Sequence, residues 1–227
     1  MVISIINGSP RTNGTTAKIL RKMKHILEQK DDVVIQYYDL TSFNITMCKG
    51  CMSCYKTGKC VITEDLVEET ADRMKQSDAV IIGSPTYGSY VTSLLKAFMD
   101  RGHFIVEQSL AGKYGFSVAT YETAEGNKAL AAIRKFFLVS GASRKGSILV
   151  KTDVKRNERK ERALEKRIAK KTERFYRCVS SRQKKSLFEY IFSDIILVLF
   201  VFKPAFSKSR DRYEGVFNSW RQKNIIR

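Results

Sequence analysis

Apolar residues along the first two thirds of the chain alternate between short continuous runs and stretches with helical spacing. The short runs predict buried strands over 2–6, 33–40, 79–83, 114–120 and 146–150. The helical spacing predicts helices over 15–29, 64–75, 91–101 and 125–139. Strands that alternate with helices indicate βαβ units, so we expect an α/β fold with one parallel sheet covered on both faces.

Five strands in about 150 residues are typical of a doubly wound sheet with the strand order 2-1-3-4-5. Such sheets bind ligands at the carboxyl ends of their strands, beside the point where the strand order reverses. The loops after the first, third and fourth predicted strands are therefore the candidate binding loops.

The pattern changes after residue 151, where we place the boundary between a domain at 1–151 and an extension at 152–227. Residues 153–185 predict a long basic helix with a sparse apolar stripe. The next segment, 187–206, is apolar, but Glu189 and Asp194 interrupt it. Its longest uninterrupted run has eight residues, whereas a membrane span needs about 20. We expect a core-packing or subunit-contact helix. A membrane-surface helix is the less favoured alternative, because basic residues flank the segment on both sides.

Composition and charge fit a folded globular protein, with 43% hydrophobic and 28% charged residues in 227. The formal net charge is +18, and 17 Lys or Arg against 5 Asp or Glu between Arg144 and Lys185 supply +12 of it. A solvated helix face is the simplest interpretation of this basic run. Contact with nucleic acid, anionic lipid or acidic partners is the alternative, and we expect no specific nucleic-acid binding. The amino-terminal apolar run is too short for a signal peptide, which favours a cytoplasmic protein.

The first candidate loop, 7-NGSPRTNGTTAK-18, joins a buried strand to a helix. The free N–H groups and positive dipole end of that helix favour an anion. Hydroxyl and amide side chains and Arg11 can add donors and charge, so the loop is typical of a phosphate site. It matches neither GxGxxG nor GxxxxGK[ST]. The alternative is an ordinary capped turn with Asn13 or Thr15 as the capping residue.

The second candidate loop, 84-SPTYGSY-90, offers aromatic faces at the same edge of the sheet. Pro85 stiffens the end of the strand, and Gly88 permits a close turn. Tyr87 and Tyr90 can stack on an aromatic ligand, or they can simply cover the sheet edge. The third loop, 120-TYETAEGN-127, adds Tyr121 at the same rim.

Four of the five cysteines lie within 48-CKGCMSCYKTGKC-60, with the spacing C-x2-C-x2-C-x5-C. Cytosolic proteins rarely use structural disulfides, so a metal site is favoured. Four thiolates in such a compact run are typical of a [4Fe–4S] cluster. A zinc site usually has two well separated CxxC pairs, and bare thiols are the third alternative. Cys178 stands apart and is interpreted as a small core residue.

These motifs, in this order and spacing, resemble the flavodoxin-like NAD(P)H-dependent FMN reductase family, and most closely its iron–sulfur flavoproteins. The motifs are GSPRTNGTT, CKGCMSCYKTGKCVI and GSPTYGSYVTSLLKAFMDR, and the resemblance covers about residues 1–150. It implies a flavodoxin-like sheet that binds FMN. By this resemblance the phosphate would lie on Ser9, Arg11, Asn13, Thr15 and Thr16. The isoalloxazine ring would lie against Pro85, Thr86, Tyr87 and Gly88, with Thr120 and Tyr121 closing the far side. The metal ligands would be Cys48, Cys51, Cys54 and Cys60.

The resemblance implies an oxidoreductase that moves electrons between NAD(P)H, or a ferredoxin-like donor, and a small-molecule acceptor such as a quinone or flavin. The cofactors carry the chemistry, so no side chain is assigned a catalytic role. His25 is expected at the surface and His103 near a subunit contact. A cluster-free NAD(P)H:quinone or flavin reductase, or a non-catalytic electron carrier or redox sensor, is the alternative function. The apolar extension also predicts a homo-oligomer.

Overall fold

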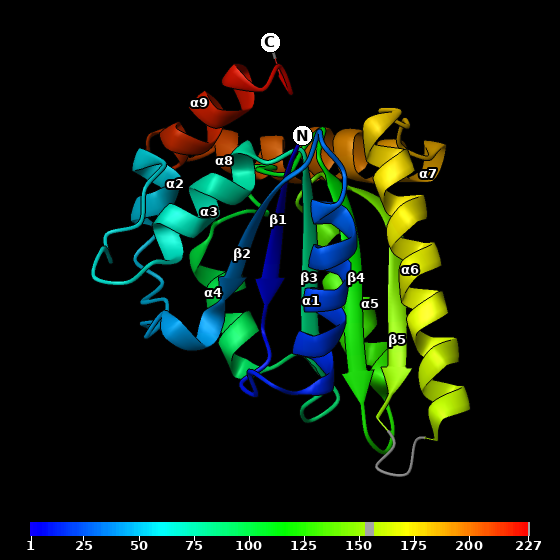
Figure 1. Cartoon of the computed structure of the whole chain (residues 1–227). Coiled ribbons are helices and arrows are strands. Elements are labelled where there is room, and N and C mark those ends of the chain that lie inside the picture. Colours follow the sequence, from blue (N-terminus) through cyan, green and yellow to red (C-terminus); the bar gives the residue numbers. More distant parts are fainter. Residues whose placement is uncertain (153–156, 227) are drawn as a thin grey trace.

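A five-stranded parallel sheet with the order β2-β1-β3-β4-β5 forms the centre of the protein in the computed structural model, which describes residues 1–152 and 157–226. The predicted fold class and strand order are confirmed. The strands are β1 (Val2–Asn7), β2 (Val34–Asp39), β3 (Ala79–Pro85), β4 (Tyr114–Tyr121) and β5 (Ser143–Lys151). All neighbouring strands pair in parallel. The carboxyl ends of β1, β3 and β4 therefore meet at one edge of the sheet (Figure 1).

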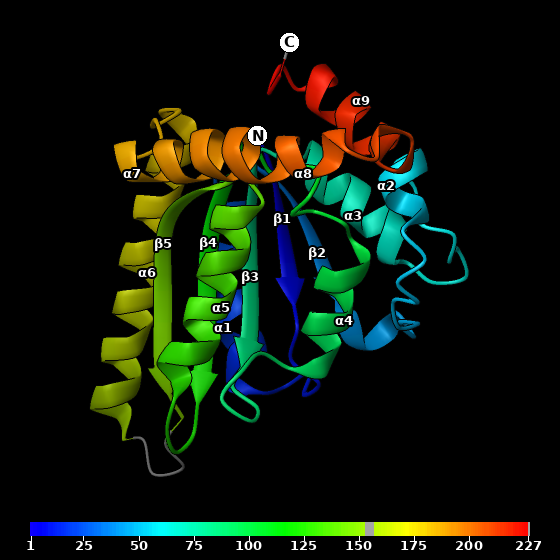
Figure 2. The same cartoon turned by 180° about the vertical axis from the view of Figure 1, so that it is seen from behind.

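Helices cover both faces of the sheet (Figures 1 and 2). One face carries α1 (Thr15–Glu28) and α6 (Glu158–Ser180), and the other carries α3 (Val67–Gln76), α4 (Ser93–Arg101) and α5 (Gly126–Val139). The apolar side of α1 packs closely on β3. A Cβ atom at Gly83 would lie 2.8 Å from a methyl carbon of Leu20, so only glycine fits that strand position.

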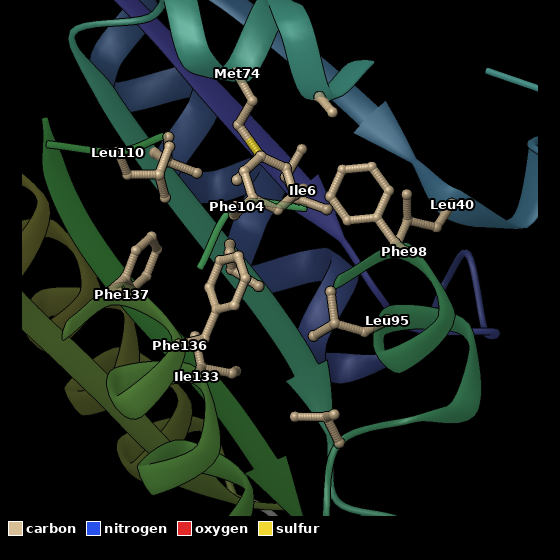
Figure 3. Packing of buried hydrophobic residues seen from close by; sticks show 14 of the residues in the cluster. Ile6, Leu40, Met74, Leu95, Phe98, Phe104, Leu110, Ile133, Phe136 and Phe137 are labelled. Atoms are coloured by element: carbon tan, nitrogen blue, oxygen red, sulfur yellow. The ribbon is translucent and has the colours of Figure 1, made fainter. Parts of the chain in front are cut away.

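The core consists of one apolar layer on each face of the sheet. On the α3–α4–α5 side, aromatic rings fill much of the space between the helices and the strands. Phe104 lies 5.8 Å from Phe98 and 5.4 Å from Phe136 between ring centroids, and Figure 3 shows these rings pointing toward one another. The α1 side holds Ile3, Ile5, Leu20 and Met23, all fully buried. This packing holds the strand ends, and hence the loops that follow them, in fixed positions.

The first part of the extension packs on the domain along its length. The long basic helix α6 lies along α1 and β5 with Ile168 and Phe175 buried, so the predicted apolar stripe faces the sheet. The first part of the predicted helix, 153–156, lies outside the described residues. The predicted division at residue 151 stays a prediction.

The segment after α6 crosses the amino ends of the strands (Figure 2). It consists of α7 (Leu187–Glu189), the π-helix η2 (Tyr190–Phe202) and α8 (Lys203–Ser207). Of the two roles expected for this segment, core packing is wrong, because only Ser193 and Val198 are buried within η2. A subunit contact stays a prediction. Among the described residues, one helix, Leu187–Ser207, is long and apolar enough to cross a membrane by length and composition.

Several short elements have no counterpart in the sequence prediction. They are the turns η1 (Leu40–Ser42) and η3 (Arg210–Tyr213) and the helices α2 (Ser53–Thr57) and α9 (Glu214–Gln222). Val216, Phe217 and Trp220 of α9 form a small separate core with Val198 of η2. This satellite core holds the end of the chain against the cysteine-containing segment.

Candidate functional site

A cavity of about 610 Å³ lies at the carboxyl edge of the sheet, where the loops after β1 and β3 and the end of β4 meet. Ten of the eleven side chains or backbone positions predicted for the flavin line it: Ser9, Arg11, Asn13, Thr15, Thr16, Pro85, Thr86, Tyr87, Thr120 and Tyr121. Gly88 is absent from the described lining. Its φ of +51° instead lets the chain turn between Tyr87 and Tyr90, whose backbones pair across the turn.

The loop after β1 is held open by hydrogen bonds within the loop and to α1. The Arg11 backbone N–H donates to Ser9 Oγ at 3.2 Å, and the Arg21 guanidinium donates to the Thr12 carbonyl at 2.7 Å. Gly14, which precedes α1, gives that helix no side-chain cap. The free N–H groups of the first turn therefore remain available to an anion at the cavity wall.

Basic side chains surround this helix start. Arg11 is exposed, and Lys18 and Lys22 also line the cavity. The sequence prediction did not include these two lysines, although their spacing from Thr15 along α1 places them on the side that faces the cavity. Helix dipole and cationic side chains together favour a phosphate group at this end of the cavity.

The loop after β3 supplies a hydroxyl group and an aromatic ring. The Thr86 backbone N–H donates to the Thr120 carbonyl at 2.7 Å, which fixes this loop against β4. Thr86 Oγ1 is buried and has no hydrogen-bond partner within the described part of the chain. Such an atom costs free energy unless a ligand or water satisfies it. Tyr87 beside it is 46% exposed, so its ring is accessible to a planar ligand.

The end of β4 closes the cavity from the other side. Thr120 Oγ1 lies 2.7 Å from Thr16 Oγ1, and this hydrogen bond joins β4 to the first turn of α1. The Tyr121 carbonyl accepts from the Thr152 backbone N–H at 2.6 Å. The ring of Tyr121 covers Gly126, where a Cβ atom would lie only 2.2 Å from a ring carbon. The two residues predicted here, Thr120 and Tyr121, are thus fixed by their neighbours.

Helix α6 forms a wall that the sequence prediction missed. Glu161, Leu164, Glu165 and Ile168 line the cavity. Leu164 and Ile168 belong to the apolar stripe that the sequence shows, so the signal was present. In sequence, the stripe belongs to the extension and not to the predicted binding site. Local spacing shows that a helix has an apolar side, but it does not show which strand or helix that side packs on.

The cysteine loop, residues 47–61, leaves this edge of the sheet and runs along its side to the extension (Figure 1). None of its cysteines is among the described residues that line the cavity. All four are free thiols; Cys48 and Cys51 are exposed, and Cys54 and Cys60 are partly buried. The described residues contain no group of three or more side chains already gathered for a metal ion. The four thiols are the donor set that an iron–sulfur cluster uses, but their convergence requires movement of the loop.

Arg101 at the end of α4 holds the base of this loop and was not singled out from the sequence. Its guanidinium donates to the Thr46 carbonyl at 2.8 Å and to the Ile62 carbonyl at 2.9 Å, one on each side of the loop. It also pairs with Asp65 at 2.6 Å, and both side chains are almost fully buried. Its Nε lies 3.3 Å from Cys60 Sγ. A single cation therefore fixes both ends of the loop and donates to one of the four thiols.

The thiols lie close enough to raise the pKa of Cys54. Burial raises the pKa of Cys54 to about 11, and the nearby Cys60, Glu107, Cys48 and Cys51 add to the shift. Negative charge on several of these groups at once is therefore unfavourable in the metal-free loop. A bound cationic cluster would remove this cost, because metal ions deprotonate the thiols that ligate them.

A buried chain of acid and base groups lies beside the cysteine loop. His103 Nδ1 lies 2.7 Å from Glu107 Oε1, and its Nε2 lies 3.5 Å from Glu68 Oε1. Burial alone lowers the pKa of His103, but the hydrogen bond to Glu107 and the nearby Glu68 carboxylate outweigh it and raise the pKa. His103 is 5% exposed and thus buried within the chain; its expected position near a subunit contact stays a prediction. His25 is exposed, as predicted.

The carboxyl-terminal extension contacts the cysteine loop through α2. Tyr55 stacks on Tyr213 with 5.8 Å between ring centroids. A Cβ atom at Gly215 would lie 2.5 Å from the Gly58 backbone nitrogen, so the start of α9 approaches the loop as closely as backbone allows. The extension thus supports the loop that carries the cysteines.

Proteins of known sequence are similar to this chain. A family model described as NADPH-dependent FMN reductase matches residues 1–152. An iron-sulfur flavoprotein of Clostridioides difficile (strain 630) is 40% identical over 227 residues, which is 100% of both chains. An iron-sulfur flavoprotein of Methanocaldococcus jannaschii is 32% identical over 137 residues, covering 59% of this chain and 70% of the relative.

Solved structures give the same fold. An FMN-dependent NADH-azoreductase from Bacillus anthracis, in complex with FMN, superposes with a TM-score of 0.62 and 14% identity over 77% of this chain and 99% of its own. The apo form of an NADH:FMN oxidoreductase gives a TM-score of 0.55 at 21% identity over 75% and 88% of the two chains. The family match spans the whole sheet and the loops at its carboxyl edge, but not the α6 wall of the cavity. One relative is similar over its full length. This chain therefore belongs to the NADPH-dependent FMN reductase family of flavodoxin-like, FMN-dependent oxidoreductases.

Proposed function

We propose that the protein passes electrons from NAD(P)H, or from a ferredoxin-like donor, to a small-molecule acceptor, using FMN in the cavity and a [4Fe–4S] cluster on Cys48, Cys51, Cys54 and Cys60. The observation that carries the FMN site is the uncapped start of α1, which opens into the cavity beside Arg11. FMN ends in a single phosphate, and this site offers one anion position with no dinucleotide fingerprint.

The residues around the cavity would bind and orient the flavin. Ser9, Asn13, Thr15 and Thr16 would supply donors for the phosphate, and Arg11 a charge. The free Thr86 hydroxyl would donate to a polar atom of the ring system, and the face of Tyr87 would stack on it. Leu164 and Ile168 would exclude water from the opposite side. FMN, when bound, accepts a hydride as two electrons and releases them singly.

Three observations support the cluster. The four thiols are free and lie in one loop, and Arg101 anchors that loop while donating to Cys60. Hydrogen bonds to the ligating sulfurs are one way in which proteins tune such a group. Relatives at 40% and 32% identity are named iron-sulfur flavoproteins. The cluster would take electrons one at a time.

A cluster-free NAD(P)H:quinone or flavin reductase is the second candidate function. It is favoured by the separation of the cysteines from the cavity lining and by their lack of convergence in the described residues. This function needs FMN but none of the four thiols.

Anaerobic turnover separates these functions. We expect FMN-loaded protein to oxidise NADH or NADPH and to reduce both a quinone and a one-electron carrier. Cys51→Ser should keep FMN and the quinone reaction but lose most reduction of the one-electron carrier. If Cys51→Ser reduces both acceptors as fast as the unmodified protein does, the cluster-free reductase is favoured. If the unmodified protein oxidises neither NADH nor NADPH, a plain electron carrier is favoured.

A further inference from the structure

The helix formed by α7, η2 and α8 lies across the amino ends of the strands, opposite the cavity (Figures 1 and 2). Only 11% of its most apolar 18-residue window is buried within the described protein. Most of a long apolar helix is therefore exposed. Soluble monomers rarely leave so large an apolar surface uncovered, so the exposure indicates a docking surface.

The two acidic residues that interrupt the apolar segment are both paired with basic residues, and only Glu189 is buried. Glu189 is buried and accepts from the Arg144 guanidinium at 2.8 Å. Asp194 lies 2.6 Å from Lys185. The wide winding of η2 repeats every four to five residues, so Glu189, Ser193 and Val198 form one buried line toward the domain. Both carboxylates are thus neutralised against the protein.

The outer face is consequently apolar along its length. Phe200 is 72% exposed, Leu187 is 74% exposed and Phe188 is 63% exposed. Ile191, Ile196 and Leu199 are exposed between them. Between Leu187 and Phe202 the partly exposed carboxylate is that of Asp194, 34% exposed and paired with Lys185. The outer face also carries aromatic rings, which favour the boundary between lipid and water.

Basic residues stand at both ends of the outer face. Lys184 precedes it, and Lys203, Lys208, Arg210 and Arg212 follow it, with Asp211 the one acidic residue between 203 and 212. Lys184, Lys203, Lys208 and Arg212 are all exposed; we call these four the basic rim. An apolar face with basic ends complements an anionic bilayer, whose head groups attract each Lys or Arg near the surface.

We propose that the outer face of Leu187–Phe202, with the basic rim, docks on the surface of an anionic lipid membrane as an interfacial helix. A second copy of this chain fits the surface less well. Two outer faces packed together would bring basic rims of two chains, each with a net charge of +18, close to one another.

Membrane spanning also fits the structure less well. The helix is held to the domain by the Glu189–Arg144 ion pair and by Val198, which packs in the satellite core with Trp220. Crossing a bilayer would break both contacts and place Glu189 in hydrocarbon, at a cost that charged side chains rarely overcome. The docked orientation leaves the cavity, at the other end of the sheet, open to water. This inference depends on neither the flavin nor the cluster.

Vesicle flotation of the purified full-length protein tests the proposal. Vesicles of phosphatidylcholine alone and vesicles with about one third phosphatidylglycerol would be compared at low and high salt. We expect the protein to float with the anionic vesicles at low salt, to be released by high salt, and to stay behind with neutral vesicles. Failure to float with anionic vesicles, or equal binding to both kinds, would overturn the proposal.

Two matched pairs of variants identify the surface. Phe188→Gln/Phe200→Gln should lower binding at least about tenfold, whereas Val34→Gln/Leu66→Gln, at exposed apolar positions elsewhere, should not. Neutralising the basic rim with Lys184→Gln, Lys203→Gln, Lys208→Gln and Arg212→Gln should also lower binding at least about tenfold. The control neutralises four exposed charges of α6: Arg159→Gln, Lys166→Gln, Lys170→Gln and Arg174→Gln.

The flavin spectrum and circular dichroism should be the same in all four variants, because the changed side chains lie outside the cavity. Equal loss of binding in the α6 control would mean that total charge, not this helix, holds the protein. Two further results would contradict docking on a membrane surface and indicate another role for the outer face. Resistance to carbonate extraction from cell membranes would indicate a spanning helix. A dimer that Phe188→Gln/Phe200→Gln dissociates, without vesicle binding, would indicate a second copy.

Discussion

Arg101 shows how one buried side chain can fix a whole loop. It is 2% exposed and joins Thr46, Ile62 and Asp65 around the base of the cysteine loop. Removing one partner of a buried ion pair leaves the other charge without compensation. Arg101→Ala should therefore lower the free energy of unfolding by about 3–5 kcal/mol, measured by denaturant unfolding.

An exposed ion pair provides the control for Arg101. Arg73 pairs with Glu69 at 2.9 Å, and both side chains are at least half exposed. Arg73→Ala should change the free energy of unfolding by less than about 1 kcal/mol. Equal effects of the two substitutions would contradict the role of Arg101 as the anchor of the loop.

His103 predicts a pH dependence of stability. Its pKa in the folded protein is raised from 6.5, because the hydrogen bond to Glu107 and the nearby Glu68 carboxylate outweigh burial. The folded state then binds the proton more tightly than the unfolded chain. Its stabilising contribution is complete below pH 6.5 and is lost as the pH rises through the raised pKa. Unfolding measured across this range should show the decline, and His103→Gln should flatten it; an unchanged profile would contradict the prediction.

Arg11 predicts how tightly the flavin binds. Its guanidinium is exposed beside the start of α1. The free energy of its charge-assisted contact with the phosphate is therefore expected at the lower end of the range for such hydrogen bonds. Arg11→Ala should weaken FMN binding by about 1.5 kcal/mol, roughly tenfold, in a fluorescence titration. Arg162→Ala, on the outer side of α6 and 75% exposed, is the matched control. Unchanged FMN affinity in Arg11→Ala would refute the assignment.

At the scale of elements, the cysteine loop and the flavin loops are separate units that substitutions can distinguish. Replacing any one of Cys48, Cys51, Cys54 and Cys60 by Ser should lower the iron content, because each iron of a [4Fe–4S] cluster takes one protein ligand. FMN content should hold, since none of the described cavity-lining residues is a cysteine. Cys178→Ser should change neither content. Iron retained equally after Cys51→Ser would exclude the four-cysteine site.

Elements with a strong local signal were predicted well from the sequence. The apolar runs of β1, β3 and β4 are buried on both faces, so continuous hydrophobicity identified them. Strand β5 begins at Ser143, earlier than predicted, because its first residues are polar and are placed by pairing with β4. The short helix α2 was not predicted. It begins after Met52, whose backbone is in the left-handed conformation, and the spacing of apolar residues gives no sign of such a start.

The candidate site was predictable where it depends on loops and not where it depends on packing. The hydroxyls and Arg11 near the end of β1 are local signals that indicated the phosphate end of the cavity. The resemblance to the FMN reductase family supplied further positions, among them Thr86 and Thr120. The α6 wall and Arg101 depend on contacts between residues far apart in sequence, such as Arg101 with Thr46. The exposed helix after α6 was misjudged because Glu189 and Asp194 count against it in sequence, whereas in space both are paired with basic residues and Glu189 is buried.

At the scale of the whole molecule, the candidate flavin cavity and the proposed membrane-docking surface lie at opposite ends of the sheet. The cavity is lined by the loops at the carboxyl edge, and the apolar helix crosses the amino edge (Figure 1). A water-soluble donor can therefore reach the cavity while the helix is docked. The cysteine loop, supported by α9, lies along the side between them, where a partner could approach without blocking either surface.

The homo-oligomer expected from the sequence stays a prediction. If the outer face of Leu187–Phe202 binds lipid, the oligomer must use another surface. Sedimentation of the full-length protein should then give at least a dimer, and Phe188→Gln/Phe200→Gln should leave its size unchanged. A clean monomer at micromolar concentration would contradict this expectation.

The cofactor content of protein purified without oxygen tests the central proposal most directly. Heat-released flavin, iron and acid-labile sulfide would be measured in one anaerobic preparation, together with its absorption spectrum. The account predicts one FMN per chain and about four iron and four sulfide atoms, with broad absorption that bleaches on reduction. Protein that neither contains nor takes up FMN, and binds no iron after anaerobic reconstitution, would contradict it.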